Sequence, residues 1–301
     1  MTLTVEEAIA RVPLWEGATH MKISPLEGGI TNRNYRVDVD GKSFHLRLAG
    51  ENTEMLGIDR ENEYKANLVA GELEFAPSVI YFIQPEGYLV TRFIDGRPIP
   101  PEEIREPQNL QRVAELLHKI HSMPSIPGTF SSFHVVRNYA EIALRYHVIF
   151  PQNFDWLVSQ MNDAEASVMY RPDFPHPCHN DLLNGNFLLS DQRLYVLDWE
   201  YAGMGDVFFD LANFSNNHEL SEHQDRFVLD CYFGKVTIRD LAHLNIMKIM
   251  SDFREAMWGL VQIGISDLDF DFREYATKHF DRLTQNLLNP NWERWLEEAR
   301  G

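Results

Sequence analysis

Carboxylates and amides crowd one short stretch of this sequence, CHNDLLNGNFLLSDQRLYVLDWEYAG, which runs from Cys178 to Gly203. Asp181 and Asn186 precede one apolar run, whereas Asp198 and Glu200 follow a second one. Polar groups beside core segments cost free energy unless they find partners. Hard oxygen ligands with room for water suit Mg²⁺, which proteins usually bind through few carboxylates and the phosphates of a substrate. The stretch therefore predicts that a metal ion or a substrate binds here.

The spacing of these residues indicates how they meet. The segments NFLLS and RLYVLD are typical of two strands joined across Asp191 and Gln192, which predicts a hairpin. Folding that hairpin brings its two ends together, so that four oxygen-bearing side chains converge. Such a site suits phosphoryl transfer, in which positioning and charge neutralisation supply most of the catalysis.

Two other interpretations of the same stretch are open at this point. Asp181 and Asn186 could form an ordinary turn through hydrogen bonds from side chain to backbone. The ligand types at His176, Cys178, His179 and Asp181 could bind zinc, but tetrahedral sites usually draw on two separated pairs, and no second Cys or His pair follows at a suitable spacing. Cys178 and Cys231 are the two cysteines of the chain, so there is no disulfide framework.

The elements that must position this stretch fall into two regions. Residues 1–94 show short strands, turns at Gly28-Gly29, Asp40-Gly41 and Glu86-Gly87, and one helix at 60–70. Residues 95–107 contain four prolines and are typical of a linker. Residues 108–301 show mainly helical spacing apart from the hairpin. Helices are expected at 110–121, 139–149, 155–169, 225–233 and 241–263, and another in GDVFFDLANF. A cleft between the two regions is a common place for a small-molecule site.

The composition excludes several classes of protein. The chain has 301 residues, of which 44% are apolar, so we expect a globular protein with a substantial core. Its formal charge of −18 would repel nucleic acid and acidic membrane surfaces and would favour cationic ligands. The acidic N-terminal segment differs from a signal peptide, and no uninterrupted apolar stretch approaches membrane-spanning length. We therefore expect a cytoplasmic location, no membrane insertion and no nucleic-acid partner.

The order His179-x-Asp181-x4-Asn186, a hairpin and then Asp198 resembles the catalytic core of protein-kinase-like phosphotransferases. HNDLLNGN followed by LDWEYA is most similar to the choline and ethanolamine kinases, within the broader aminoglycoside phosphotransferase-like group. The resemblance covers nearly the whole chain. It implies an α+β, bilobal, protein-kinase-like fold, with a small antiparallel-sheet N-lobe that holds one helix and a large, mainly helical C-lobe.

The resemblance also implies roles for the residues of the central stretch. Asp181 would accept or orient the proton of the substrate hydroxyl, and His179 would brace the catalytic loop. Asn186 and Asp198 would hold Mg²⁺, and Glu200 would support a second metal ion. Asp210, in the GDVFFDLANF segment, matches a family position that braces the same loop and is interpreted as structural.

The nucleotide site of the N-lobe is predicted through the resemblance, because the sequence has no GxxxxGK[ST] loop. ATP is the expected co-substrate. Arg47, paired with Glu63, would clamp its phosphates, and the adenine would lie near Arg92 to Ile94. The strand turn that would cover the phosphates contains Gly28, Gly29, Thr31 and Asn32. Without the resemblance, the stretch GGITN is typical of an ordinary hairpin turn. Arg47 and Glu63 would likewise be interpreted as an ion pair on the surface.

The acceptor is expected to be a small cationic alcohol held by aromatic rings. Trp258 and Tyr275 match choline-pocket positions of the family, and Tyr201 directly follows Glu200. Two positions depart from the family pattern. Asn217 replaces an acidic residue of many choline kinases, and Val261 stands where a second tryptophan is frequent. Both changes weaken a cation cage.

We therefore expect an ATP- and Mg-dependent kinase that phosphorylates a small amino alcohol, with choline first and ethanolamine next. A kinase of another small cationic or hydroxylated molecule, such as thiamine or an aminoglycoside, is the alternative within enzymes. A nucleotide-binding pseudokinase is the alternative outside them, although all four polar positions of the transfer motif are intact. A homodimer is compatible with the sequence.

Overall fold

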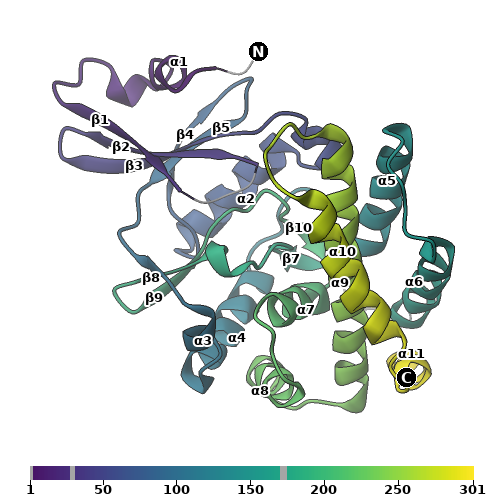
Figure 1. Cartoon of the computed structure of the whole chain (residues 1–301). Helices are drawn as coiled ribbons and strands as arrows, with labels where there is room; N and C mark the ends of the chain where they lie inside the picture. Colours follow the sequence, from purple (N-terminus) through teal and green to yellow (C-terminus); the bar gives the residue numbers. More distant parts are fainter. Residues whose placement is uncertain (1–2, 28–30, 170–174) are drawn as a thin grey trace.

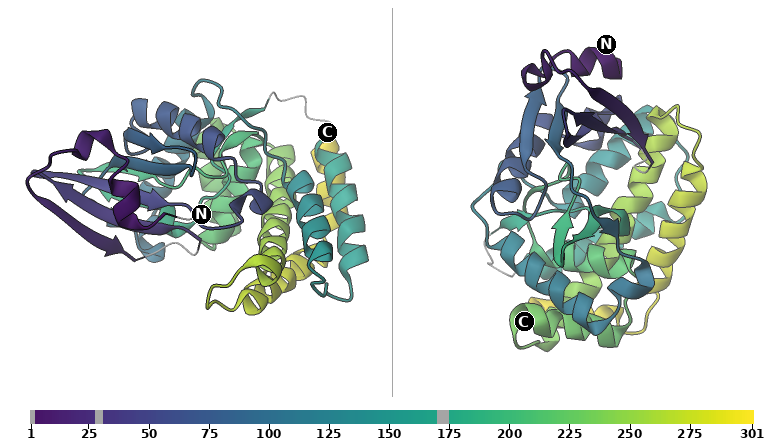
Figure 2. Two further views of the ribbon diagram at one scale, coloured as in Figure 1. Left: turned by 90° about the horizontal axis from the view of Figure 1, so that it is seen from above. Right: turned by 90° about the vertical axis from the view of Figure 1, so that its left-hand side faces the viewer.

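A computed structural model describes residues 3–27, 31–169 and 175–301 of the chain (Figure 1). A strand-rich lobe and a mainly helical lobe lie at opposite ends of the molecule, as both views in Figure 2 show. The fold is therefore α+β with an antiparallel N-terminal sheet, as the sequence predicted.

The N-terminal sheet has the strand order β1-β2-β3-β5-β4, with every neighbouring pair antiparallel. Its strands are β1 Met21–Leu26, β2 Arg33–Val39, β3 Lys42–Leu48, β4 Val79–Ile83 and β5 Tyr88–Arg92. Asp40 and Gly41 both have positive φ, which suits the predicted two-residue turn between β2 and β3. Short helix α1 (Val5–Ile9) packs against the sheet and closes its small apolar core.

Helix α2 (Arg60–Glu72) confirms the helix predicted at 60–70, whereas α1 is a second helix of this lobe that was not predicted. Its first turn is capped by Asp59, whose Oδ1 accepts hydrogen bonds from the N–H groups of Glu61 and Asn62. Ala66 and Ala70 on one face are fully buried. Glu63 lies on the same helix and is also buried, which brings a charged side chain into contact with the sheet.

The segment 95–107 contains two short elements, strand β6 (Arg97–Pro98) and helix α3 (Pro101–Ile104). β6 pairs with β8 (Phe187–Ser190), which pairs with β9 (Arg193–Val196). The hairpin β8–β9 is the one predicted across Asp191 and Gln192. At Gly96 a Cβ atom would stand 2.9 Å from the carbonyl oxygen of Leu189, so a side chain cannot fit there. The segment thus joins the two lobes at the edge of the hairpin.

The C-terminal lobe is built around helix α9 (Ile238–Ile265), which is buried along most of its length. A helix that is buried on every side must be covered all round by other elements. Its neighbours are α5 Ser132–Arg145, α6 Phe154–Val168, α7 Val207–Asn217, α10 Phe272–Leu287 and α11 Trp292–Arg300. Helices α4 (Pro107–His121) and α8 (Glu222–Phe233) pack on each other, and β7 (His176–Cys178) pairs with β10 (Gly203–Gly205).

Most helices predicted from spacing are present, but one is displaced. The segment 139–149 was expected to be helical throughout, whereas α5 begins at Ser132 and ends at Arg145. The hydroxyl of Ser131 accepts a hydrogen bond from His134 N and starts the helix earlier, while His147 adopts a φ of 57°, which ends it. Helices α10 and α11 were not predicted.

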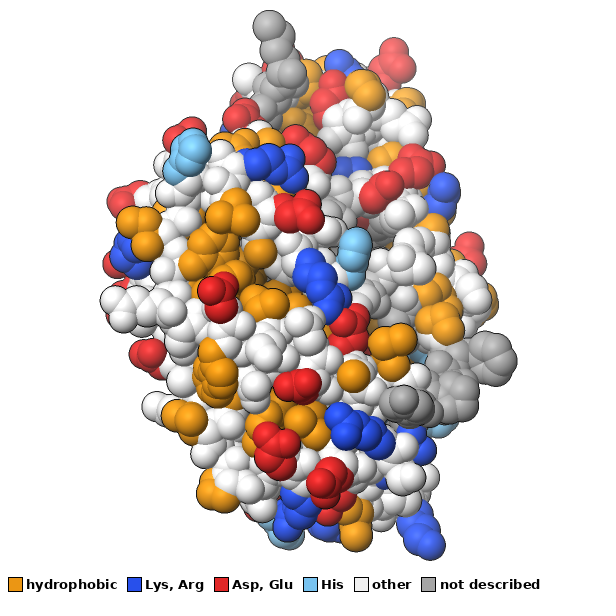
Figure 3. Space-filling model, turned by 90° about the vertical axis from the view of Figure 1, so that its right-hand side faces the viewer, with side chains coloured by type: hydrophobic (Ala, Val, Ile, Leu, Met, Phe, Trp, Pro, Cys, Tyr) orange, Lys and Arg blue, Asp and Glu red, His pale blue; other side chains and the backbone are white. Residues whose placement is uncertain are grey.

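The surface and the helices agree with the composition. No described helix combines the length and apolar character that are needed to cross a membrane. On the face shown in Figure 3, basic side chains are interspersed with acidic ones rather than gathered in a stripe.

Candidate functional site

A cavity of about 700 Å³ lies between the two lobes. Its walls come from strands β3 and β5, the segment after β5, the loop of residues 179–186 and helix α9. This loop is called the catalytic loop below, after its predicted role. The predicted residues that line it are Thr31, Asn32, Arg47, Arg92, Ile94, Asp181, Asn186, Asp198, Glu200, Tyr201, Trp258 and Tyr275. Two further predicted residues, Gly28 and Gly29, lie outside the described residues. The two ends of the hairpin therefore meet at this cavity, as predicted for Asp181, Asn186, Asp198 and Glu200.

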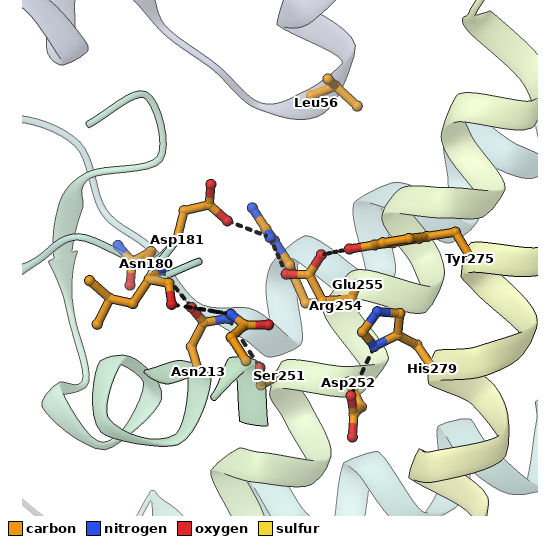
Figure 4. A network of polar contacts seen from close by, with 12 residues as sticks. Leu56, Asn180, Asp181, Asn213, Ser251, Asp252, Arg254, Glu255, Tyr275 and His279 are labelled. Atoms are coloured by element: carbon orange, nitrogen blue, oxygen red, sulfur yellow. Dashed lines mark hydrogen bonds and ion pairs between the residues drawn. The ribbon is translucent and has the colours of Figure 1, made fainter. Parts of the chain in front are cut away.

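Side chains of helix α7 fix the backbone of the catalytic loop through hydrogen bonds. The two carboxylate oxygens of Asp210 accept hydrogen bonds from His179 N (2.8 Å) and Asn180 N (2.6 Å). One turn further along the helix, Asn213 Oδ1 accepts a hydrogen bond from Leu182 N (2.6 Å). Asn213 also donates to Ser251 Oγ on α9 (Figure 4). Asp210 thus contacts the loop backbone, and Asn213 does the same although sequence reasoning missed it. The shared spacing of i and i+3 on one helix face was the available signal.

His179 lies beneath the loop rather than in the cavity. Its Nε2 donates to the carbonyl oxygen of Leu197 (2.9 Å), and its Nδ1 accepts from Asp181 N (3.3 Å). Burial lowers the pKa of His179 to about 4, so the ring is neutral near pH 7. This geometry fits a residue that braces the loop between the two ends of the hairpin.

The carboxylate of Asp181 faces the cavity and meets a charge that was not predicted. Its Oδ1 lies 3.2 Å from Nη1 of Arg254, on α9. Burial raises the pKa of Asp181 to about 7, although the Arg254 guanidinium opposes this change. Glu255 follows Arg254 and also lines the cavity.

Asn186 and Asp198 offer oxygen atoms that suit Mg²⁺. Nδ2 of Asn186 donates to the backbone oxygen of Asp181 (2.8 Å), which leaves its Oδ1 as the atom able to bind a cation. Asp198 has a φ of 61°, and its Oδ1 lies 3.1 Å from Nη1 of Arg47. Burial and the neighbouring Glu200 carboxylate raise the pKa of Asp198 well above its usual range. A bound cation would offset this crowding of carboxylates, so the donor set fits the ion.

Glu200 connects the two lobes. Its Oε2 accepts from Asn32 Nδ2 (3.0 Å) and from Arg60 Nη1 (3.0 Å). Arg60 also pairs with Glu63 (2.8 Å), and Glu63 pairs with Arg47. The predicted Arg47–Glu63 pair is therefore buried instead of lying on the surface, and it belongs to a network that includes Asp198 and Glu200. Arg60 was missed in the sequence, where it appeared as an ordinary first-turn residue of a helix.

The predicted acceptor residues meet different surroundings. The rings of Trp258 and Tyr275 contact each other at an interplanar angle of 66°, with their centroids 5.4 Å apart. The guanidinium of Arg254 lies 4.2 Å from the centre of the Tyr201 ring and covers one face. Asn217 donates to Leu182 O and Asn213 Oδ1. In the described part of the chain, neither Asn217 nor Val261 lines the cavity. Asn217 therefore contacts the loop rather than the acceptor space.

The structure gives the zinc interpretation no support. Nδ1 of His176 interacts with the carbonyl oxygen of His121, and both ring nitrogens of His179 have the partners given above. Among the described residues, the clustered ligand types are instead His121, Cys178 and Asp210. In that cluster His121 Nε2 already hydrogen-bonds to Asp210. The polar atoms there hold the fold together.

Comparison with known proteins agrees with this geometry. The family described as choline/ethanolamine kinase matches residues 23–231. The chain belongs to the choline/ethanolamine kinase family. Human ethanolamine kinase 2 is 28% identical over 84% of this chain and 73% of its own length. A choline/ethanolamine kinase family protein from Mesorhizobium loti superposes with a TM-score of 0.84 at 28% identity, covering 99% of both chains.

The same fold extends beyond this family. A spectinomycin phosphotransferase, whose structure is a complex with ADP and spectinomycin, superposes with a TM-score of 0.62 at 16% identity, covering 99% of this chain and 98% of that one. The chain therefore has the protein-kinase-like fold that the aminoglycoside phosphotransferases share, and it is a small-molecule kinase by family.

Proposed function

We propose that this enzyme transfers the γ-phosphate of ATP, with Mg²⁺, to the hydroxyl of a small amino alcohol, with choline or ethanolamine as the acceptor. The observation that carries the proposal is that Asp181, Asn186 and Asp198 face one cavity between the lobes. Phosphoryl transfer needs a group that orients the nucleophile next to groups that neutralise the phosphates. The three residues offer both in one place.

Each residue has a defined task in this proposal. Asp181 accepts the proton of the acceptor hydroxyl as the phosphoryl group moves away from ADP, and Arg254 keeps its carboxylate oriented. Asn186 Oδ1 and Asp198 hold Mg²⁺, which supplies charge neutralisation and orientation of the phosphates when it is bound. Arg47 contacts the phosphates from β3, and Glu63 holds its guanidinium in place.

The acceptor half of the cavity supports a cationic alcohol. Trp258 and Tyr275 present aromatic surface, and Glu255 adds a carboxylate on the same side. Cation–π attraction contributes about 0.5 to 2 kcal/mol for each favourable ring. An aminoglycoside would instead need a wide cleft lined by carboxylates. The aromatic walls therefore favour a small amino alcohol.

The direct experiment measures Mg-dependent release of ADP from ATP with choline, ethanolamine, thiamine or an aminoglycoside, against a control without acceptor. Stimulation by choline or ethanolamine alone supports the proposal. Stimulation by thiamine or the aminoglycoside alone would keep the mechanism and reject the substrate class. Stabilisation of the fold by Mg-ATP without turnover of any acceptor would indicate a pseudokinase.

A further inference from the structure

Helix α9 buries two adjacent charged residues in the middle of the C-terminal lobe. Arg254 is 2% exposed and Glu255 is 3% exposed, and both line the cavity between the lobes. Burying a charge is expensive unless it is paired and hydrogen-bonded. A packed pair of apolar residues would stabilise a helix core at least as well. Their position beside Asp181 therefore indicates a role in the site.

The contacts of this pair connect the base to the acceptor space. A single nitrogen, Arg254 Nη1, hydrogen-bonds to both Asp181 Oδ1 and Glu255 Oε1. The other oxygen of Glu255 accepts a hydrogen bond from the hydroxyl of Tyr275 (2.7 Å). Figure 4 shows Arg254 between the two carboxylates, with Tyr275 on the far side of Glu255. The two carboxylates are thus held at a fixed short separation, as the hydroxyl and ammonium groups of a short amino alcohol are.

The charge of this cluster suits a monocation. Two carboxylates, those of Asp181 and Glu255, face the single guanidinium of Arg254 in a buried space. Although burial acts in the opposite direction, Arg254 and the other partners of Glu255 keep the pKa of this carboxyl below its usual value. An acceptor with one positive charge would neutralise the cluster, whereas a neutral alcohol would leave its charge uncompensated.

Beyond Trp258 and Tyr275, three described residues that could have strengthened a cation cage have other surroundings. Asn217 stands where the family pattern has an acidic residue, and its amide hydrogen-bonds to the catalytic loop. The guanidinium of Arg254 already covers one face of the Tyr201 ring. Val261, at a position where the resemblance implies a second tryptophan, is fully buried. Electrostatic attraction by a carboxylate must therefore replace part of an aromatic cage.

We propose that Glu255 binds the ammonium group of the acceptor and that Arg254 fixes Glu255 relative to Asp181. This inference rests on the proposed function and names the group that selects a cationic acceptor. Glu255 is then a specificity-determining residue, and Arg254 is a positioning residue.

The test compares each cationic acceptor with its neutral carbon isostere. Choline is paired with 3,3-dimethylbutan-1-ol, and ethanolamine is paired with propan-1-ol. Steady-state kcat/KM is measured for each alcohol in the full-length wild type and in Glu255→Gln, which keeps the shape of the side chain and removes its charge. Glu274→Gln is the matched control, because Glu274 is an exposed glutamate next to Tyr275.

The wild type should prefer the cation of whichever pair it phosphorylates. Glu255→Gln should reduce that preference about tenfold or more, mainly through KM of the cationic alcohol, and should leave KM for ATP within about twofold. Glu274→Gln should retain the preference. An unchanged preference in a folded, active Glu255→Gln enzyme would overturn the inference.

Removing one partner of a buried pair can unfold a protein, so a second variant is needed. Arg254→Met with Glu255→Gln removes both charges and leaves no unpaired guanidinium. Because Arg254 also orients Asp181, the preference of this double variant is measured as its binding affinity for the cationic alcohol relative to the neutral isostere, which requires no turnover. The double variant should also lose the preference for the cation, and retention of it would contradict the role of Glu255. Failure of the proposed function gives a different result, because the wild type would then phosphorylate neither choline nor ethanolamine.

Discussion

Asp181 must satisfy two opposing demands. A proton acceptor is most effective when its pKa lies near the working pH, and burial moves the pKa of this carboxyl to about 7. The same burial would keep it protonated if no positive charge lay nearby. Arg254, on another element, supplies that charge at 3.2 Å. Under the proposed function, the residue that makes Asp181 usable as a base is therefore 73 positions away in the sequence.

Replacing Asp181 with asparagine should separate chemistry from folding. An amide of the same shape keeps the packing but cannot accept the proton, so kcat should fall at least about 100-fold. Stabilisation by Mg-ATP, measured as a rise in Tm, should remain because the nucleotide contacts are unchanged. Asp191→Asn, at the exposed tip of the hairpin, is the matched control. A variant with kcat within about threefold of the wild type would exclude Asp181 as the base.

At the scale of elements, α7 determines where the catalytic loop lies. Asp210 and Asn213 accept hydrogen bonds from the backbone N–H groups of three residues of the loop. The loop therefore cannot shift without breaking buried hydrogen bonds. Such a bond contributes about 1 kcal/mol net, but leaving a buried donor unpaired costs about 1 to 3 kcal/mol. Rigid placement of a reacting group is itself a source of rate.

Asn213→Ala should therefore damage both stability and turnover. It leaves Leu182 N without its acceptor, so the free energy of unfolding should fall by about 1 to 3 kcal/mol and kcat by about tenfold or more. Asn216→Ala is the control on the same helix, since Asn216 bonds to Lys248 O instead of the loop. Urea unfolding and steady-state kinetics of both variants decide the matter. Equal losses of kcat would show that Asn213 acts through stability alone.

The elements that could be predicted were those with strong local signals. The β8–β9 hairpin has apolar runs around a two-residue turn, and α2 has a capping aspartate, so both were found. Helix α5 was displaced although Phe133 and Val136 continue its apolar spacing and Ser131 caps it, so its earlier start was readable in the sequence. Helix α10 was missed although Asp271 caps it and its buried apolar residues recur at helical spacing.

The site followed the same rule. Asp181, Asn186 and Asp198 were placed together because a short hairpin fixes their relation within one stretch of chain. Arg60, Arg254 and Glu255 were not predicted, since each also has a partner on another element, namely Glu200, Asp181 and Tyr275. Local patterns therefore indicated the reaction, whereas the charges that tune it depend on tertiary contacts.

At the scale of the whole molecule, charged side chains connect the lobes across the cavity. Arg47 reaches Asp198, and Arg60 reaches Glu200, from strand β3 and helix α2 respectively. The segment between the lobes adds a strand to the catalytic hairpin. The two lobes are thus joined on both sides of the cavity by contacts that involve the site itself.

The stability of the whole fold should depend on pH through buried histidines. His218 packs against the rings of Phe187 and Phe214, and burial lowers its pKa to about 4. In the unfolded chain its pKa is about 6.5, so between those values the unfolded state binds more protons. The free energy of unfolding therefore falls as the pH drops below about 6.5, and this group accounts for about 2 kcal/mol between pH 7 and pH 5.

His218→Phe should reduce this dependence on pH because it keeps an aromatic ring against the two phenylalanines and removes the titrating group. Urea unfolding at pH 7 and pH 5 should show that the wild type loses about 2 kcal/mol more than the variant over that interval. Loss of the hydrogen bond from Nδ1 to Phe214 O lowers the stability of the variant at both pH values, so the difference between them is the informative quantity. His134→Phe, at an exposed position, controls for the loss of an imidazole. If the wild type and His218→Phe lose equal stability on acidification, His218 is not one of the groups that couple the fold to pH.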